Sequence, residues 1–155
     1  MTENTRLRSR STASGTPVQA AAALVGAVFL LVGVLGFIPG ITTDSGSLEA
    51  AGHESHAELL GIFQVSVLHN VVHLLFGVAG IALARRPASA RAFLLGGGAV
   101  YLVLFVYGLV VDKDSQANFV PLNSADNWLH LVLGIGMIAL GVVLAKRPGT
   151  TGVGR

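Results

Sequence analysis

The chain has 155 residues, of which 52% are hydrophobic and 12% are charged, and its mean hydropathy is +0.70. This composition is too apolar for a soluble domain and indicates a membrane protein, whose main partner is the lipid bilayer. The formal net charge of +2 does not indicate nucleic-acid binding, because the basic residues flank apolar segments, and the absence of cysteine excludes disulfides and thiol chemistry.

Four apolar segments follow in chain order, each close to the roughly 20 residues that a helix needs to cross a bilayer. They are Val18–Ile38, Ser66–Ala84, Ala92–Val111 and Ala125–Ala145. The sequence therefore predicts an all-α fold, a bundle of four transmembrane helices within residues 17–147. The tails, 1–16 and 148–155, are rich in Ser, Thr, Gly and Arg without apolar periodicity, so we expect them to be disordered.

The charges are distributed asymmetrically around these segments. Nine of the ten basic residues lie in the two tails or between the second and third segments: Arg6, Arg8, Arg10, Arg85, Arg86, Arg91, Lys146, Arg147 and Arg155. Seven of the eight acidic residues lie in or beside the other two loops: Asp44, Glu49, Glu54, Glu58, Asp112, Asp114 and Asp126. By the positive-inside rule, this pattern predicts a multi-pass protein of the cell membrane with both termini in the cytoplasm.

The second and fourth segments contain the same motif. The stretch SVLHNVVHLLFGVAGIAL aligns without gaps on NSADNWLHLVLGIGMIAL at an offset of 57 residues, so that Asn70 matches Asn127 and His73 matches His130. The first and third segments also match weakly. We therefore expect two helical-hairpin repeats, 18–84 and 92–147. Because each repeat crosses the membrane twice, the repeats are parallel and related by an axis along the membrane normal.

Helical spacing places four polar residues of each copy on one helix face. They are Ser66, His69, Asn70 and His73 in the first copy, and Asn123, Asp126, Asn127 and His130 in the second. Polar groups that face lipid are costly, so both faces are predicted to point inward. We expect one set of three residues to face the other across the interface between the copies, in the outer half of the membrane and away from lipid: His69, Asn70 and His73 against Asp126, Asn127 and His130.

The sequence leaves several roles open for these residues. In a structural role, Ser66 and Asn123 cap their helices, Asn123 and Asp126 form a capping box, and the remaining side chains join the repeats through hydrogen bonds of roughly 0.6 kcal/mol each. Alternatively, the same face binds a small polar ligand, a lipid headgroup or a quinone.

Two cofactor hypotheses also fit the motif. A divalent metal could be held by His69, His73, Asp126 and His130, since imidazole and carboxylate are suitable ligands. A haem b could instead take His73 and His130 as axial ligands. No cofactor is required by the sequence, and both hypotheses are alternatives to the structural role.

The first outer loop, GHESHAELLG, contains His53, Glu54, His56 and Glu58. It lacks the HExxH spacing of a zinc protease, so we expect a solvated helical turn there. No motif places a nucleophile beside a base, and no residue set indicates an enzyme. Trp128 is expected to lie in the outer aromatic belt.

The motifs FQVSVLHNVVHLLFGVAG and NSADNWLHLVLGIGM resemble the two signatures of a prokaryotic family of four-helix membrane proteins catalogued as a domain of unknown function (4383 group). The similarity covers about residues 18–147, although Ser66-Val67 stands where an Asn-Pro pair is common in that family. The resemblance implies four helices and no established activity. We therefore expect a non-enzymatic structural or accessory membrane protein, with a homo-oligomer or a membrane protein partner left open.

Overall fold

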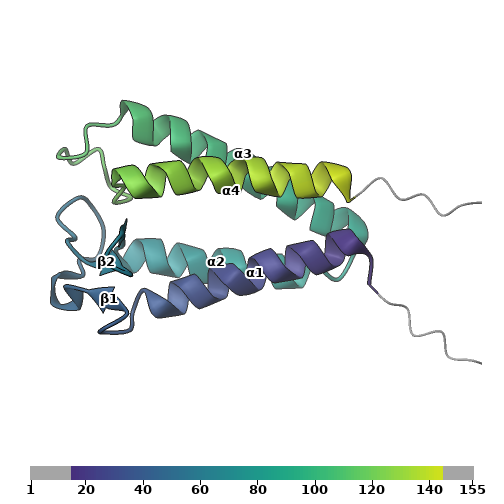
Figure 1. The fold of residues 1–155 in the computed structure, drawn as a ribbon, viewed down its shortest axis with the longest axis horizontal. Helices are drawn as coiled ribbons and strands as arrows, with labels where there is room; N and C mark the ends of the chain where they lie inside the picture. The colour runs from purple at the N-terminus through teal and green to yellow at the C-terminus, as the bar shows by residue number, and fades with distance from the viewer. Residues whose placement is uncertain (1–14, 145–155) are drawn as a thin grey trace, which may run out of the picture.

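The computed structural model describes residues 15–144, and within this range it contains four α-helices (Figure 1). These are α1 (Pro17–Leu35), α2 (Val67–Leu83), α3 (Pro87–Val110) and α4 (Ser124–Val143). Helix α1 packs along α2, which together we call the first helix pair, and α3 packs along α4, the second helix pair. The loops 36–66 and 111–123 lie at one end, the loop end, and the α2–α3 connection lies at the opposite end.

Three of the helices are long and apolar enough to cross a membrane: α1, α3 and α4. The structure thus supports the prediction of a membrane protein. Helix α2 has 17 residues and is shorter than the expected segment because Ser66 and Ala84 cap its two ends. At 1.5 Å per residue it is about 26 Å long, slightly less than the hydrocarbon thickness of a typical bilayer. Helix α3 begins at Pro87, earlier than expected, since proline is well suited to the first turn of a helix.

Part of the predicted N-terminal tail belongs to the start of α1. Thr16 is the N-cap residue. Its backbone N–H and its hydroxyl both donate hydrogen bonds to the side-chain oxygen of Gln19, each at 3.0 Å. Gln19 also donates to the carbonyl oxygen of Ala84 at 2.9 Å, joining the start of α1 to the end of α2. The other residues that were predicted to be disordered are 1–15 and 148–155. Of these the structure describes only Gly15, which lies in no helix or strand.

The first loop contains a small antiparallel sheet that the sequence did not predict. Its strands are β1 (Thr42–Thr43), β2 (Glu58–Leu59) and β3 (Phe63–Gln64), in the order β1-β2-β3. Leu59 and Val65 are buried beneath the sheet and pack against the end of α1. The helical turn expected around His53 is therefore wrong: His53 and Glu54 lie in a turn, and Glu58 lies in β2.

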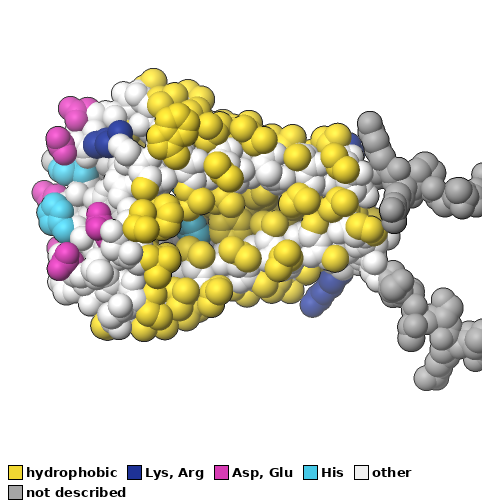
Figure 2. Space-filling view, viewed as in Figure 1, with side chains coloured by type: hydrophobic (Ala, Val, Ile, Leu, Met, Phe, Trp, Pro, Cys, Tyr) yellow, Lys and Arg dark blue, Asp and Glu magenta, His cyan; other side chains and the backbone are white. Residues whose placement is uncertain are grey.

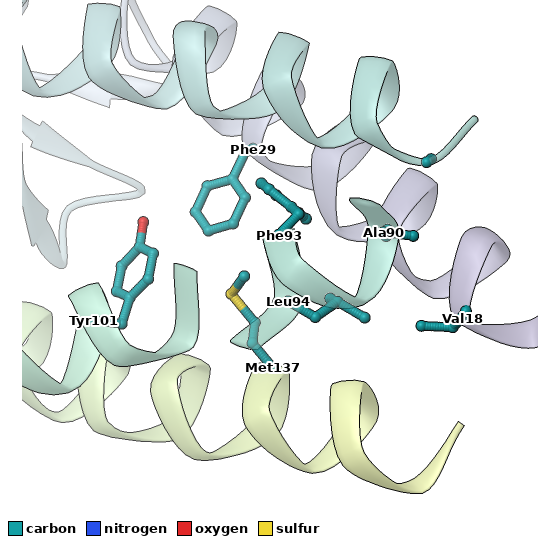
Figure 3. Packing of buried hydrophobic residues seen from close by; sticks show 9 residues of the cluster. Val18, Phe29, Ala90, Phe93, Leu94, Tyr101 and Met137 are labelled. Carbon is teal, nitrogen blue, oxygen red and sulfur yellow. The ribbon is translucent and has the colours of Figure 1, made fainter. Parts of the chain in front are cut away.

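The two helix pairs meet in an aromatic core (Figure 3). Phe29 of α1 stacks on Tyr101 of α3 with 5.5 Å between ring centroids, and it meets Phe76 of α2 edge-on at 4.9 Å. Met137 of α4 lies in the same cluster. The stack of Phe29 on Tyr101 crosses between the pairs, whereas the contact of Phe29 with Phe76 lies inside the first pair. The helices inside each pair also approach each other through glycines.

The surface separates acidic, apolar and basic regions along the molecule (Figure 2). Acidic side chains gather at the loop end, where Asp44, Glu49, Glu54, Asp112 and Asp114 are exposed. An apolar belt covers the middle, and the connection between α2 and α3 carries exposed arginines. This arrangement fits a protein surrounded by lipid with two polar ends.

A candidate ligand site between the helix pairs

The helix caps predicted from the sequence are confirmed. The Ser66 side chain accepts a hydrogen bond from the N–H of His69 at 3.1 Å at the start of α2. At the start of α4, Asn123 accepts from the N–H of Asp126 at 2.9 Å, and the Asp126 carboxylate accepts from the N–H of Asn123 at 3.0 Å. These bonds satisfy donors that a helix start would otherwise leave unpaired.

Asp126 also joins the second helix pair to the loop of the first. The same carboxylate oxygen accepts from the backbone N–H of Gln64 in β3 at 3.0 Å, and Asn123 donates to the carbonyl oxygen of Ile62 at 2.7 Å. Asp126 is only 2% exposed. The motif analysis missed Gln64 and Ile62, because both use backbone groups that no side-chain pattern reveals.

Three histidines converge between the helix pairs. The rings of His69 and His73 on α2 stack with 4.4 Å between their centroids, and His130 on α4 meets the ring of Tyr101 at 5.1 Å. His69, His73 and His130 line the same two cavities, so the two copies of the motif do bring their histidines together. We call these three residues the histidine cluster.

The hydrogen bonding of the histidine cluster is incomplete. Nδ1 of His73 lies 2.9 Å from the carbonyl oxygen of His69. A carbonyl can only accept, so Nδ1 carries the proton and Nε2 of the neutral ring is an acceptor. Nδ1 of His69 and Nδ1 of His130 have no protein partner, although these side chains are only 8% and 4% exposed. An unpaired buried polar atom costs about 1–3 kcal/mol, so both nitrogens favour a polar group beside them.

The two asparagines do not follow the expected arrangement. The Asn70 amide lies directly against Gly36 at the end of α1, and the Asn127 amide lies directly against Gly108 near the end of α3. Each asparagine thus packs inside its own helix pair and not against the other copy. The physical reason is the turn of about 100° between successive helix residues, which directs Asn70 away from the side that carries His69.

Three neighbouring spaces surround the histidine cluster. A pocket of about 310 Å³ lies between α2 and α3 and is lined by His69, His73, Tyr101 and His130 together with apolar residues. A smaller space of about 120 Å³, the inner chamber, is lined by the three histidines, Asp126 and apolar residues of α1, α4 and the sheet. A groove of about 310 Å³ between α1 and α4, the α1–α4 groove, is apolar except for His73. Figure 2 shows a hollow between the pairs with a histidine side chain at its floor.

Residues 19–143 match the sequence model of a family described as a domain of unknown function (DUF4383). The chain belongs to this family. The resemblance of the two motifs is thereby confirmed, and the prokaryotic distribution it implied stays a prediction. No curated protein and no solved structure matches the chain.

The metal and haem hypotheses gain no support from the geometry. Within residues 15–144, no group of three or more histidine, aspartate or glutamate side chains is arranged to hold a metal ion. Asp126, the only carboxylate proposed as a ligand, already accepts two backbone N–H groups.

Proposed function

We propose that this chain is a non-enzymatic, accessory membrane protein that binds a small and largely apolar molecule between its two helix pairs. One observation carries the proposal: His69 and His130 line cavities whose walls are otherwise mostly apolar, and each has a buried ring nitrogen without a protein partner. Small-molecule sites typically combine apolar walls with a few polar groups that fix orientation. A bound polar group would complete the hydrogen bonding of both imidazoles.

We further propose that the two helix pairs are repeats of one helical hairpin, 18–84 and 92–147, arranged in parallel. Support comes from equivalent contacts: Gly26 meets Gly77 and Gly36 meets Asn70 in the first pair, while Gly98 meets Gly134 and Gly108 meets Asn127 in the second. Residues that match in sequence thus make matching contacts, as expected for a duplicated unit.

The difference between His69 and Asp126, which occupy equivalent positions in the two copies, has a physical explanation under this proposal. Asp126 accepts the backbone N–H of Gln64, whereas the equivalent His69 approaches the backbone of Pro121. Gln64 and Pro121 are equivalent positions, and proline has only a carbonyl to offer. A donor is therefore required at position 69 where an acceptor is required at position 126.

We place the protein in the cell membrane with both termini in the cytoplasm, on the basis of the charge distribution. The chain lacks cysteine, so single cysteines report topology directly. In intact cells, a membrane-impermeant maleimide is expected to label Asp114→Cys at the loop end but not Ala88→Cys at the opposite end until the cells are opened. Labelling of Ala88→Cys in intact cells would reverse the orientation.

Native mass spectrometry tests the binding function. The protein is extracted from its membranes in mild detergent, and the wild type is compared with the His69→Phe/His130→Phe double variant. We expect the wild type to retain a small molecule that the variant has lost, because phenylalanine fills a similar volume without a hydrogen-bonding nitrogen. His56→Phe, an exposed loop change, is the matched control. A wild type that carries nothing, or a variant that carries the same molecule, would contradict the proposal.

A further inference from the structure

We infer that the bound molecule is an uncharged lipid with a single hydrocarbon chain and a ring-sized headgroup that carries hydrogen-bonding oxygens, which is the chemistry of a prenylquinone. The headgroup occupies the inner chamber and the chain lies in the α1–α4 groove. This inference rests on the proposed function and concerns binding only.

The groove gives the molecule a route from the bilayer to the histidine cluster. The α1–α4 groove and the inner chamber share four lining residues: Val32, His73, Leu129 and Leu133. The groove and the chamber therefore lie next to each other. Leu24 and Val28 line its outer part and are 66% and 47% exposed on the side that lipid covers. From Leu24 to Val32 the groove runs about 12 Å along α1, so the rest of a long chain extends into the bilayer.

The lining indicates an uncharged headgroup. The residues that line the chamber and the groove, all in the described part of the chain, include no lysine or arginine. A phosphate or carboxylate headgroup would thus lie beside the Asp126 carboxylate with no cation to neutralise it, which is costly in a site of low dielectric. Neutral imidazoles supply both donors and acceptors, and these suit carbonyl or hydroxyl oxygens.

The positions of the donors favour a ring with oxygens on two sides. His69 belongs to the first helix pair and His130 to the second, and in each of them Nδ1 is buried without a protein partner. A headgroup with two separated oxygens spans the two pairs. One oxygen accepts a hydrogen bond from a His130 N–H, and the other lies beside His69. Because His69 directs its N–H to the backbone of Pro121, its other ring nitrogen is an acceptor, which the hydroxyl of the reduced quinol form satisfies. The chamber of about 120 Å³ has room for a group of several heavy atoms, and its walls include the aromatic ring of Phe63.

The inference is tested by thermal unfolding of the full chain in phosphatidylcholine nanodiscs, with a prenylquinone of two isoprene units as the probe. We expect the melting temperature to rise by at least 5 °C at saturation. His130→Phe is expected to weaken binding at least tenfold by removing a headgroup contact. Val28→Trp, which fills the groove, is expected to do the same, whereas Val103→Trp on the exposed face of α3 leaves binding unchanged.

Two further ligands separate the inference from the proposed function. A fatty alcohol tests whether the chain and a single hydroxyl suffice, and a lysophosphatidylglycerol tests the requirement for an uncharged headgroup. Stabilisation by either ligand equal to that by the quinone overturns the inference. If the quinone produces no shift while native mass spectrometry finds another molecule retained by the histidines, the inference fails and the proposed function stands. If nothing is retained, the proposed function itself fails.

Discussion

Replacement of Asp126 by alanine is expected to lower the free energy of unfolding by about 2–5 kcal/mol. The carboxylate accepts two backbone N–H groups, those of Gln64 and Asn123, and the residue is almost fully buried. Its removal leaves both donors without a partner, and each unpaired buried donor costs about 1–3 kcal/mol. The change also removes half of the capping box of α4.

The measurement is thermal or chemical unfolding in detergent, with two variants for comparison. Asp126→Asn keeps one acceptor oxygen, so we expect a loss smaller than that of the alanine variant. Asp114→Ala removes an exposed carboxylate at the same end of the molecule and is expected to change the free energy of unfolding by less than about 0.5 kcal/mol. Equal stability of Asp126→Ala and Asp114→Ala would show that the link between β3 and α4 contributes nothing.

The sequence could predict two kinds of feature: helices whose apolar pattern extends over many residues, and caps that depend on residues close together in the chain. Apolar segments of about 20 residues predicted the helices, and Ser66 and Asn123 predicted their first turns, because side-chain caps depend on residues only three positions apart. The sheet could not be predicted in the same way. Its strands have two residues each, which is too short for an alternating pattern to be recognised.

The structure matches the predicted arrangement of the polar residues only in part. Helical spacing correctly brought His73 and His130 to shared cavities. Helical spacing could not tell which residues of the polar face of α2 are directed toward α3 and α4 and which toward α1, because that face is broad enough to include both. The partners of Asn70 and Asn127 are glycines, and a glycine has no side chain that would mark it as a contact. The link from Asp126 to Gln64 uses a backbone N–H, which every residue except proline carries.

The structural and ligand-binding roles of the histidine cluster predict opposite effects of one substitution. If His130 joins the helix pairs through its own hydrogen bonds, His130→Phe removes stabilising contacts and lowers the free energy of unfolding. In the structure Nδ1 of His130 has no partner. Replacing an unpaired buried polar group by an apolar group of similar shape is neutral or stabilising.

We therefore expect His130→Phe to raise the stability of the ligand-free protein by about 1–2 kcal/mol while it abolishes retention of the bound molecule. Unfolding of lipid-stripped protein in detergent measures the first effect, and His56→Phe in the exposed loop controls for the added aromatic ring. A loss of stability of 1 kcal/mol or more in ligand-free His130→Phe would identify His130 as a structural residue. A gain in stability together with lost binding is the pattern of a site whose residues are kept for a ligand at some cost to the fold.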